Sequence, residues 1–305
     1  MVETVAARGI GHEGDNMPIE TLVFYGALVL WAGLLVQGLR TSAWRGFTYF
    51  GIALMLVLNI GYFVRGQGDA IAFFVSIYDL LDNAGVSSDG ELPVALSTCA
   101  DNACSIATNY DSHPAWGVAF HDRFANGPTL RRSLLFGHIA FNTIAFVLAH
   151  VQLAKPGTGG IARQHRLLGR IGFGSVTLGT LFAVLLAGEH GAVEEYGGIW
   201  AMLGFFSMAF VVYGCAIKTV ATARAGNIAE HRVWMFRFLG AMWGAFWLFR
   251  VMLFVLGPIM RNVEAGAILT CIWFSAPLGV LIAEWFRKRR PTPADRGVQH
   301  TPAMA

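Results

Sequence analysis

Seven apolar stretches dominate the sequence, and each has about the length that a helix needs to cross a lipid bilayer. A hydrocarbon core about 30 Å thick requires about 20 apolar residues in a helix. With 55% hydrophobic and 13% charged residues and a mean hydropathy of +0.54, the chain is too apolar for a water-soluble protein of 305 residues. We therefore predict an all-α, polytopic membrane protein, a seven-transmembrane-helix bundle embedded in the lipid bilayer. The stretches cover residues 19–39, 46–65, 133–154, 168–188, 197–222, 233–256 and 264–286.

The positive charges predict the orientation of these spans, because Lys and Arg are retained in cytoplasmic loops. When the loops are assigned alternately to the two sides, most of the 22 Lys and Arg residues fall on the side that holds segments 155–170 and 218–237 and the C-terminal tail. We expect the N-terminus outside and the C-terminus in the cytoplasm. The first stretch has no basic segment before it and no A-x-A site after it, so we expect a span and not a cleaved signal peptide.

The segment 66–131 differs from the rest because it is acidic and falls on the predicted outer side. Its first part, DAIAFFVSIYDLLDN, places Asp69, Asp79 and Asp82 on one stripe, which favours an amphipathic helix on the membrane surface. Cys99 and Cys104 follow in an irregular loop, where an oxidising environment would let them form a disulfide. The loop is either functional, as a lid or as a docking surface for a larger membrane complex, or a tolerated insertion.

We interpret residues 1–305 as a single membrane domain. Small residues four apart, Gly240 with Gly244 and Ser175 with Gly179, predict close helix packing in its core. The parts are two N-terminal spans (19–65), the outer loop with its interfacial helix (66–131), a four-helix core (133–256), a last span (264–286) and a disordered tail (287–305).

Two helix beginnings carry the same His-Arg pattern, RQHRLLGR at 163–170 and EHRVWMFR at 230–237. Asn227 followed by Glu230 resembles a capping box, which predicts a helix start near Ile228. Both beginnings would lie on the cytoplasmic side, where their arginines either fix the orientation or attract an anion such as a phosphate or a carboxylate. The candidate binding residues are His165, Arg166, Arg170, His231, Arg232 and Arg237.

The motifs HRLLGR and HRVWMFR, preceded by the helix GHIAFNTIAFVLAHVQL, resemble the signature of a bacterial membrane family known as domain of unknown function 2306. The likeness covers roughly residues 133–256, and it implies a multi-pass protein of the bacterial inner membrane. Because the family has no assigned activity, the resemblance implies positions and no mechanism. These positions are His138, His165, Arg166, Gly169, Arg170, His231, Arg232, Trp234, Met235, Arg237 and Arg250.

Histidines inside the third stretch limit the cofactors that it could bind. His138, Asn142 and Gln152 share one helix face, which we expect to point into the bundle. His150 points about 120° away from His138, so two haems stacked between these positions are disfavoured. A single b haem remains open, with His150 and either His165 or His231 as iron ligands and arginines on the propionates.

Arg250 is the other ionisable side chain inside a predicted span, and such a group needs an anionic partner or several carbonyl acceptors. Glu189, Glu264 or a bound ligand could supply the partner, and the pair could be functional or could simply lock two helices. Glu284, near the end of the last span, is expected to face lipid headgroups.

Three functions are compatible with these patterns. The first is an integral membrane redox protein, a b-haem-binding or quinone-reactive electron-transfer subunit. The second is a transporter or receptor for a small anion or a lipid headgroup, with His138 and Arg250 on the outer side and the His-Arg beginnings on the inner side. The third is an accessory subunit that docks through 66–131.

The chain has no G-x-S-x-G, Walker or H-E-x-x-H motif, so no sequence feature supports hydrolytic chemistry. Its net charge of +3 follows from topology signals, and we therefore predict no nucleic-acid binding.

Overall fold

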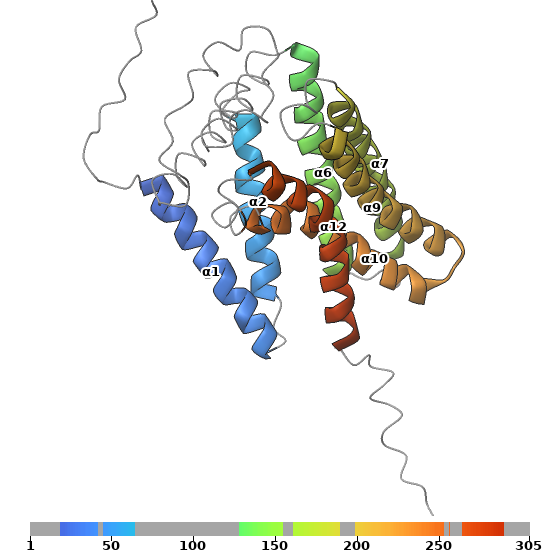
Figure 1. Cartoon of the computed structure of the whole chain (residues 1–305). Coiled ribbons are helices and arrows are strands. Elements are labelled where there is room, and N and C mark those ends of the chain that lie inside the picture. The colour runs from blue at the N-terminus through green and yellow to red at the C-terminus, as the bar shows by residue number, and fades with distance from the viewer. Residues whose placement is uncertain are drawn as a thin grey trace, which may run out of the picture. The chain divides into compact units, whose positions relative to one another are not determined.

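The computed structural model is helical, and no strand occurs in the residues it describes, which are 19–41, 45–64, 128–154, 161–189, 199–252, 256 and 264–289. The amphipathic helix, the cysteines Cys99 and Cys104 and the proposed docking loop lie outside these residues. The helices are coloured along the chain in Figure 1. They are α1 (Ile19–Thr41), α2 (Arg45–Val64), α6 (Thr129–Ala154), α7 (Ile161–Gly188), α9 (Ile199–Arg224), α10 (Ile228–Trp243), the π-helical turn η2 (Gly244–Leu248) and α12 (Glu264–Arg289).

Four of the described helices are long and apolar enough to cross a membrane. This confirms the coarser part of the prediction, an all-α chain with several membrane-spanning helices. A helix also occupies each of the other three predicted stretches, although the apolar segments Val29–Gly38 and Arg45–Val57 are shorter and α10 passes into a π turn at Gly244. The four spans are Thr129–Gln152, Arg163–Gly188, Ile199–Arg224 and Leu269–Lys288.

Two helices extend beyond the apolar stretches that predict them. α7 begins at Ile161, before the apolar stretch that starts at 168, so the first His-Arg pattern lies in the first turns of the helix, as predicted. α12 continues to Arg289, and residues 287–289 therefore belong to it and not to the predicted tail. Hydropathy marks only the lipid-embedded part of a helix, whereas backbone hydrogen bonding continues through basic residues that favour helix.

The chain divides into two compact units, Met1–Leu54 and Met55–Ala305, and the division falls within α2. In the first unit the rings of Trp31 and Phe47 stack at a centroid distance of 4.8 Å. In the second unit α6 packs against α7, α7 against α9, and α10 against both α9 and α12 (Figure 1). This second unit contains the candidate site.

Short connections and internal hydrogen bonds shape the second unit. Gly226, with a φ of +73°, turns the chain between α9 and α10. Asn227 Oδ1 accepts a hydrogen bond from the backbone N of Glu230 at 3.1 Å, so α10 begins at Ile228 as the capping pattern predicts. Within the spans, hydroxyls such as those of Thr143 and Thr219 donate to the carbonyl four residues earlier, which satisfies polar groups in apolar surroundings.

α10 and α12 approach each other closely through glycines. A Cβ on Gly240 would lie 2.6 Å from the carbonyl oxygen of Gly279, and a Cβ on Gly244 would lie 2.8 Å from the Cα of Ala276. The close packing predicted from Gly240 and Gly244 is therefore confirmed. Ser275 is fully buried at the same crossing. The contact places the start of η2 directly against α12.

Candidate functional site

One end of the second unit gathers basic residues from four helices. We call it the basic end and define it by residues 161–170, 219–237 and 284–289. Gln152 Nε2 donates to the carbonyl of His165 at 2.7 Å, which connects the end of α6 to the start of α7. His231 Nδ1 donates to the carbonyl of Thr219 at 2.9 Å, which connects α10 to the end of α9. The first bond fixes the backbone of His165, and the second fixes the imidazole of His231.

The two His-Arg patterns meet at the basic end. The rings of His165 and His231 lie 6.2 Å apart between centroids and stand at 83° to each other. Arg166, Arg170 and Arg232 are exposed around them, and no other described residue forms a hydrogen bond or ion pair with these three guanidinium groups. The sequence patterns therefore identify residues that come together in space.

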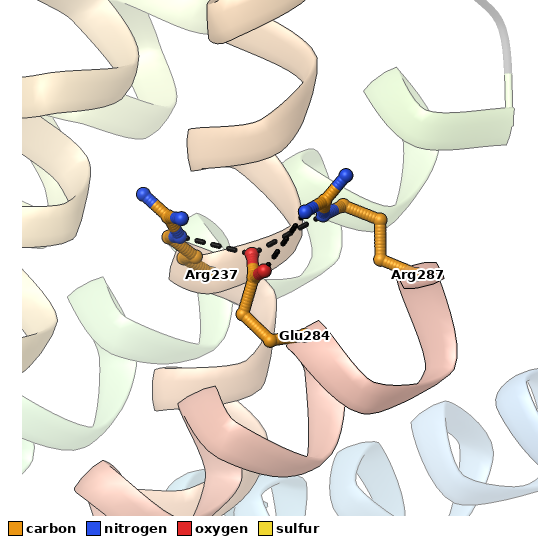
Figure 2. A network of polar contacts seen from close by, with 3 residues as sticks. All are labelled: Arg237, Glu284 and Arg287. Atoms are coloured by element: carbon orange, nitrogen blue, oxygen red, sulfur yellow. Dashed lines mark hydrogen bonds and ion pairs between the residues drawn. The ribbon is translucent and has the colours of Figure 1, made fainter. Parts of the chain in front are cut away.

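Arg237 differs from these exposed arginines because it has a carboxylate partner (Figure 2). Its Nε donates to Glu284 Oε1 at 2.9 Å, and its guanidinium carbon lies 4.4 Å from the centroid of the Trp234 ring. Arg287 donates to the same carboxylate through Nη2, at 2.9 Å from Oε2, and through Nε. The expectation that Glu284 faces lipid headgroups is wrong, because two arginines hold this side chain, which is only 16% exposed.

The predicted polar face of α6 points toward α7. His138 Nδ1 donates to the carbonyl of Gly179 at 3.0 Å, and a Cβ on Gly179 would lie 2.7 Å from the Asn142 amide. Ala145 and Ala149, between the polar residues, are buried. The face therefore points into the bundle as predicted, and glycines on α7 make room for its polar side chains.

His150 faces α10, away from that seam. Its Nδ1 donates to the carbonyl of Phe146 at 2.7 Å, and its Nε2 accepts from Trp243 Nε1 at 2.9 Å. An imidazole whose two nitrogens are both hydrogen-bonded has no lone pair left for a metal. His150 does not fit the role of an iron ligand in this arrangement. No group of three or more His, Cys, Asp or Glu residues among the described ones is placed to hold a metal ion.

Arg250 lies in the helical residues 249–252 that follow η2, away from the basic end. Its Nη1 donates to the carbonyl of Phe246 at 2.6 Å, and its guanidinium carbon lies 4.2 Å from the centroid of the Phe246 ring. It lies near enough to His138 for the two side chains to interact electrostatically. The side chain of Glu264, one proposed partner, lies outside the described residues.

Glu189, the other proposed partner of Arg250, binds Arg131. Arg131 Nε lies 2.9 Å from both carboxylate oxygens, and its Nη2 lies 2.7 Å from Oε1. The pair joins the start of α6 to the end of α7. The sequence could have predicted this pair. Two antiparallel helices that are joined by a short link also lie close together at their far ends, where Arg131 and Glu189 stand.

Comparisons with protein-family models, curated proteins and solved structures found no match to this chain. The site is therefore interpreted from its own geometry. That geometry offers a cationic, imidazole-bearing surface at one end of the bundle, with exposed guanidinium donors that suit phosphate or carboxylate oxygens.

Proposed function

We propose that this protein is a membrane receptor or carrier that binds a small oxyanion, a phosphate or carboxylate group, at its basic end. The observation that carries the proposal is the meeting of the two His-Arg patterns, with His165 and His231 6.2 Å apart and Arg166, Arg170 and Arg232 exposed around them. Guanidinium groups bind such anions in a bidentate manner, and the starts of α7 and α10 direct backbone N–H groups to the same end.

The balance of charge supports the same proposal. The described acidic side chains at the basic end are Glu230 and Glu284, and Glu284 is already bound by Arg237 and Arg287. Five other arginines at this end are exposed: Arg163, Arg166, Arg170, Arg224 and Arg232. Attraction of this kind weakens as salt is added, because exposed charges are screened over about 8 Å at physiological ionic strength.

We also propose that α1, α2 and α10 with η2 cross the membrane, which gives seven spans, an outer N-terminus and a cytoplasmic basic end in a bacterial inner membrane. A helix at each of the seven apolar stretches supports this topology, as does the gathering of arginines at one end of the second unit. The paired His-Arg motifs support a relationship to the family of domain of unknown function 2306.

Thermal unfolding of the detergent-purified protein tests the function, with phosphate, citrate or chloride added at equal ionic strength. A ligand that binds only the folded state stabilises it by about 2.7 kcal/mol at a concentration about 100 times its Kd. We expect phosphate or citrate to raise the unfolding midpoint of the wild type. The double variant Arg166→Gln/Arg170→Gln should lose most of that rise.

The matched control is Arg45→Gln, which removes an exposed arginine from the first compact unit and should respond like the wild type. Equal responses of the wild type and the double variant would exclude the proposed site. Equal responses to chloride and phosphate would indicate general screening of charge.

A redox function is the second candidate, and one observation favours it. His231 Nδ1 is fixed by the carbonyl of Thr219, an arrangement common among metal-bound imidazoles, and the ring of His165 lies beside it. A haem at this place would have His165 and His231 as iron ligands, and the exposed arginines would bind its propionates. A quinone would accept hydrogen bonds from the same histidines and arginines. Absorption spectroscopy of the purified protein decides the haem form, since the absence of a Soret band excludes it.

A further inference from the structure

Arg237 is fixed in place, yet only part of its guanidinium is used. Its Nε binds Glu284, and its guanidinium carbon lies over the ring of Trp234. The rest of the guanidinium extends away from the carboxylate in Figure 2, and no described residue accepts a hydrogen bond from its terminal nitrogens. Arg131, by contrast, engages Glu189 through both Nε and Nη2. Arg237 therefore retains unused donors in a half-buried position.

Glu284 is shared between two cations. Its Oε1 accepts from Arg237 Nε at 2.9 Å and from Arg287 Nε at 3.3 Å, and its Oε2 accepts from Arg287 Nη2 at 2.9 Å. Arg287 lies one turn further along the same helix. One carboxylate thus faces two guanidinium groups and leaves an excess of positive charge. If Arg237 turned to another anion, Glu284 would keep Arg287 and would not be left as an unpaired charge, which is the strongly unfavourable case.

Arg237 is also close to the surface on which the His-Arg patterns meet. His231 binds the carbonyl of Thr219 on α9, and Arg237 follows six residues later on α10, about 9 Å further along the helix axis. For an anion that enters beside His231 and Arg232, Arg237 is therefore the next arginine inward on α10.

We propose that Glu284 is an internal counter-ion of the anion site: it occupies Arg237 when the site is empty, and an incoming phosphate group displaces it. This inference rests on the proposed anion-binding function, and it names the inner anchor of the site and its competitor. The exchange replaces a single Nε contact by a bidentate one and leaves Glu284 bound to Arg287. It also releases a link between α10 and α12, while the crossing of Gly240 and Gly279 keeps the two helices together.

Phosphate binding to single variants tests the proposal by calorimetry on the full chain in neutral detergent. Glu284→Gln should bind inorganic phosphate several-fold more tightly than the wild type, because the amide competes less well for Arg237 yet can still accept its hydrogen bond. Arg237→Gln should lose most of the binding. The matched control is Glu230→Gln, which removes an exposed acidic charge at the same end that forms no hydrogen bond or ion pair with Arg237.

Equal tightening by Glu284→Gln and Glu230→Gln would overturn the counter-ion role and leave the anion site intact. No phosphate binding by the wild type, in detergent or in a bilayer, would overturn both proposals. Unfolding midpoints of the ligand-free variants show that each is folded before binding is compared.

The source of the phosphate is resolved by repeating the comparison in nanodiscs of phosphatidylcholine with or without phosphatidic acid. If the affinities of the variants for inorganic phosphate differ in detergent, the ligand is a free anion. If they differ only in nanodiscs that contain phosphatidic acid, the ligand is a lipid headgroup. In either case, the displacement of Glu284 is supported if Glu284→Gln binds the phosphate group more tightly than the wild type and Arg237→Gln binds it more weakly.

Discussion

At the scale of single residues, the histidines of this protein have different tasks that depend on which of their nitrogens is in use. His231 binds one backbone carbonyl and directs the rest of its ring toward His165. His150 binds a carbonyl and an indole, and it lies against the ring of Phe146 at a centroid distance of 4.2 Å. His231 is thus a candidate for ligand contact, and His150 connects α6 to α10.

Removing the indole donor should therefore destabilise the bundle. Trp243→Phe leaves the buried Nε2 of His150 without its donor, and an unsatisfied buried group of this kind costs about 1–3 kcal/mol. We expect a lower midpoint of thermal unfolding in detergent. Trp285→Phe is the control, because Trp285 is 43% exposed and its replacement removes little buried contact. Equal midpoints for the two variants would show that the bond to His150 contributes nothing to stability.

At the scale of helices, the crossing of α10 and α12 depends on the absence of side chains. A Cβ on Gly279 would contact the carbonyl oxygen of Gly240 and would lie 2.7 Å from the Cα of Gly244. These neighbours are backbone atoms, which cannot rotate away as a side chain does. Pro277 lies beside the crossing within α12, a helix that is not straight in Figure 1. Proline is a common cause of such bends.

A larger residue at this crossing should separate the two helices. Gly279→Val should destabilise the protein by about 1–3 kcal/mol or more, as overpacking of a tight interface does. The control is Gly214→Ala on α9, where nothing lies within 4 Å of the added Cβ and where alanine favours helix more than glycine does. We expect unfolding midpoints to fall for the first variant and to rise or stay constant for the second. A fall of similar size in both would contradict the role of the crossing.

At the scale of the whole molecule, the proposed topology places the basic end on the cytoplasmic side of the membrane. Single cysteines at Gln164 and Glu230, both exposed, should react alike with a membrane-impermeant maleimide. A cysteine at Thr129, at the start of α6, should show the opposite accessibility. In intact bacterial cells we expect labelling at 129 only. Labelling of just one of positions 164 and 230 would place them on opposite sides and exclude a shared anion site.

The sequence predicts the helices well and the partners of individual side chains poorly. Apolar length locates the helices, and alternation of spans is enough to bring His165 and His231 to one end. The partner of Arg237 depends on how α10 and α12 are rotated about their axes, which the close glycine contacts set. Hydropathy predicts where a helix begins and ends, but it does not predict how that helix is rotated about its axis. The expectation for Glu284 failed for this reason.

The π turn η2 holds one residue more per turn than the helix on either side of it. A chain with one residue deleted between 244 and 248 would return to regular α-helix. Every later side chain of that helix would then swing by about 100° around the axis and move by about 1.5 Å along it. Arg250 would then point in another direction, so a single extra amino acid determines the orientation of this cation.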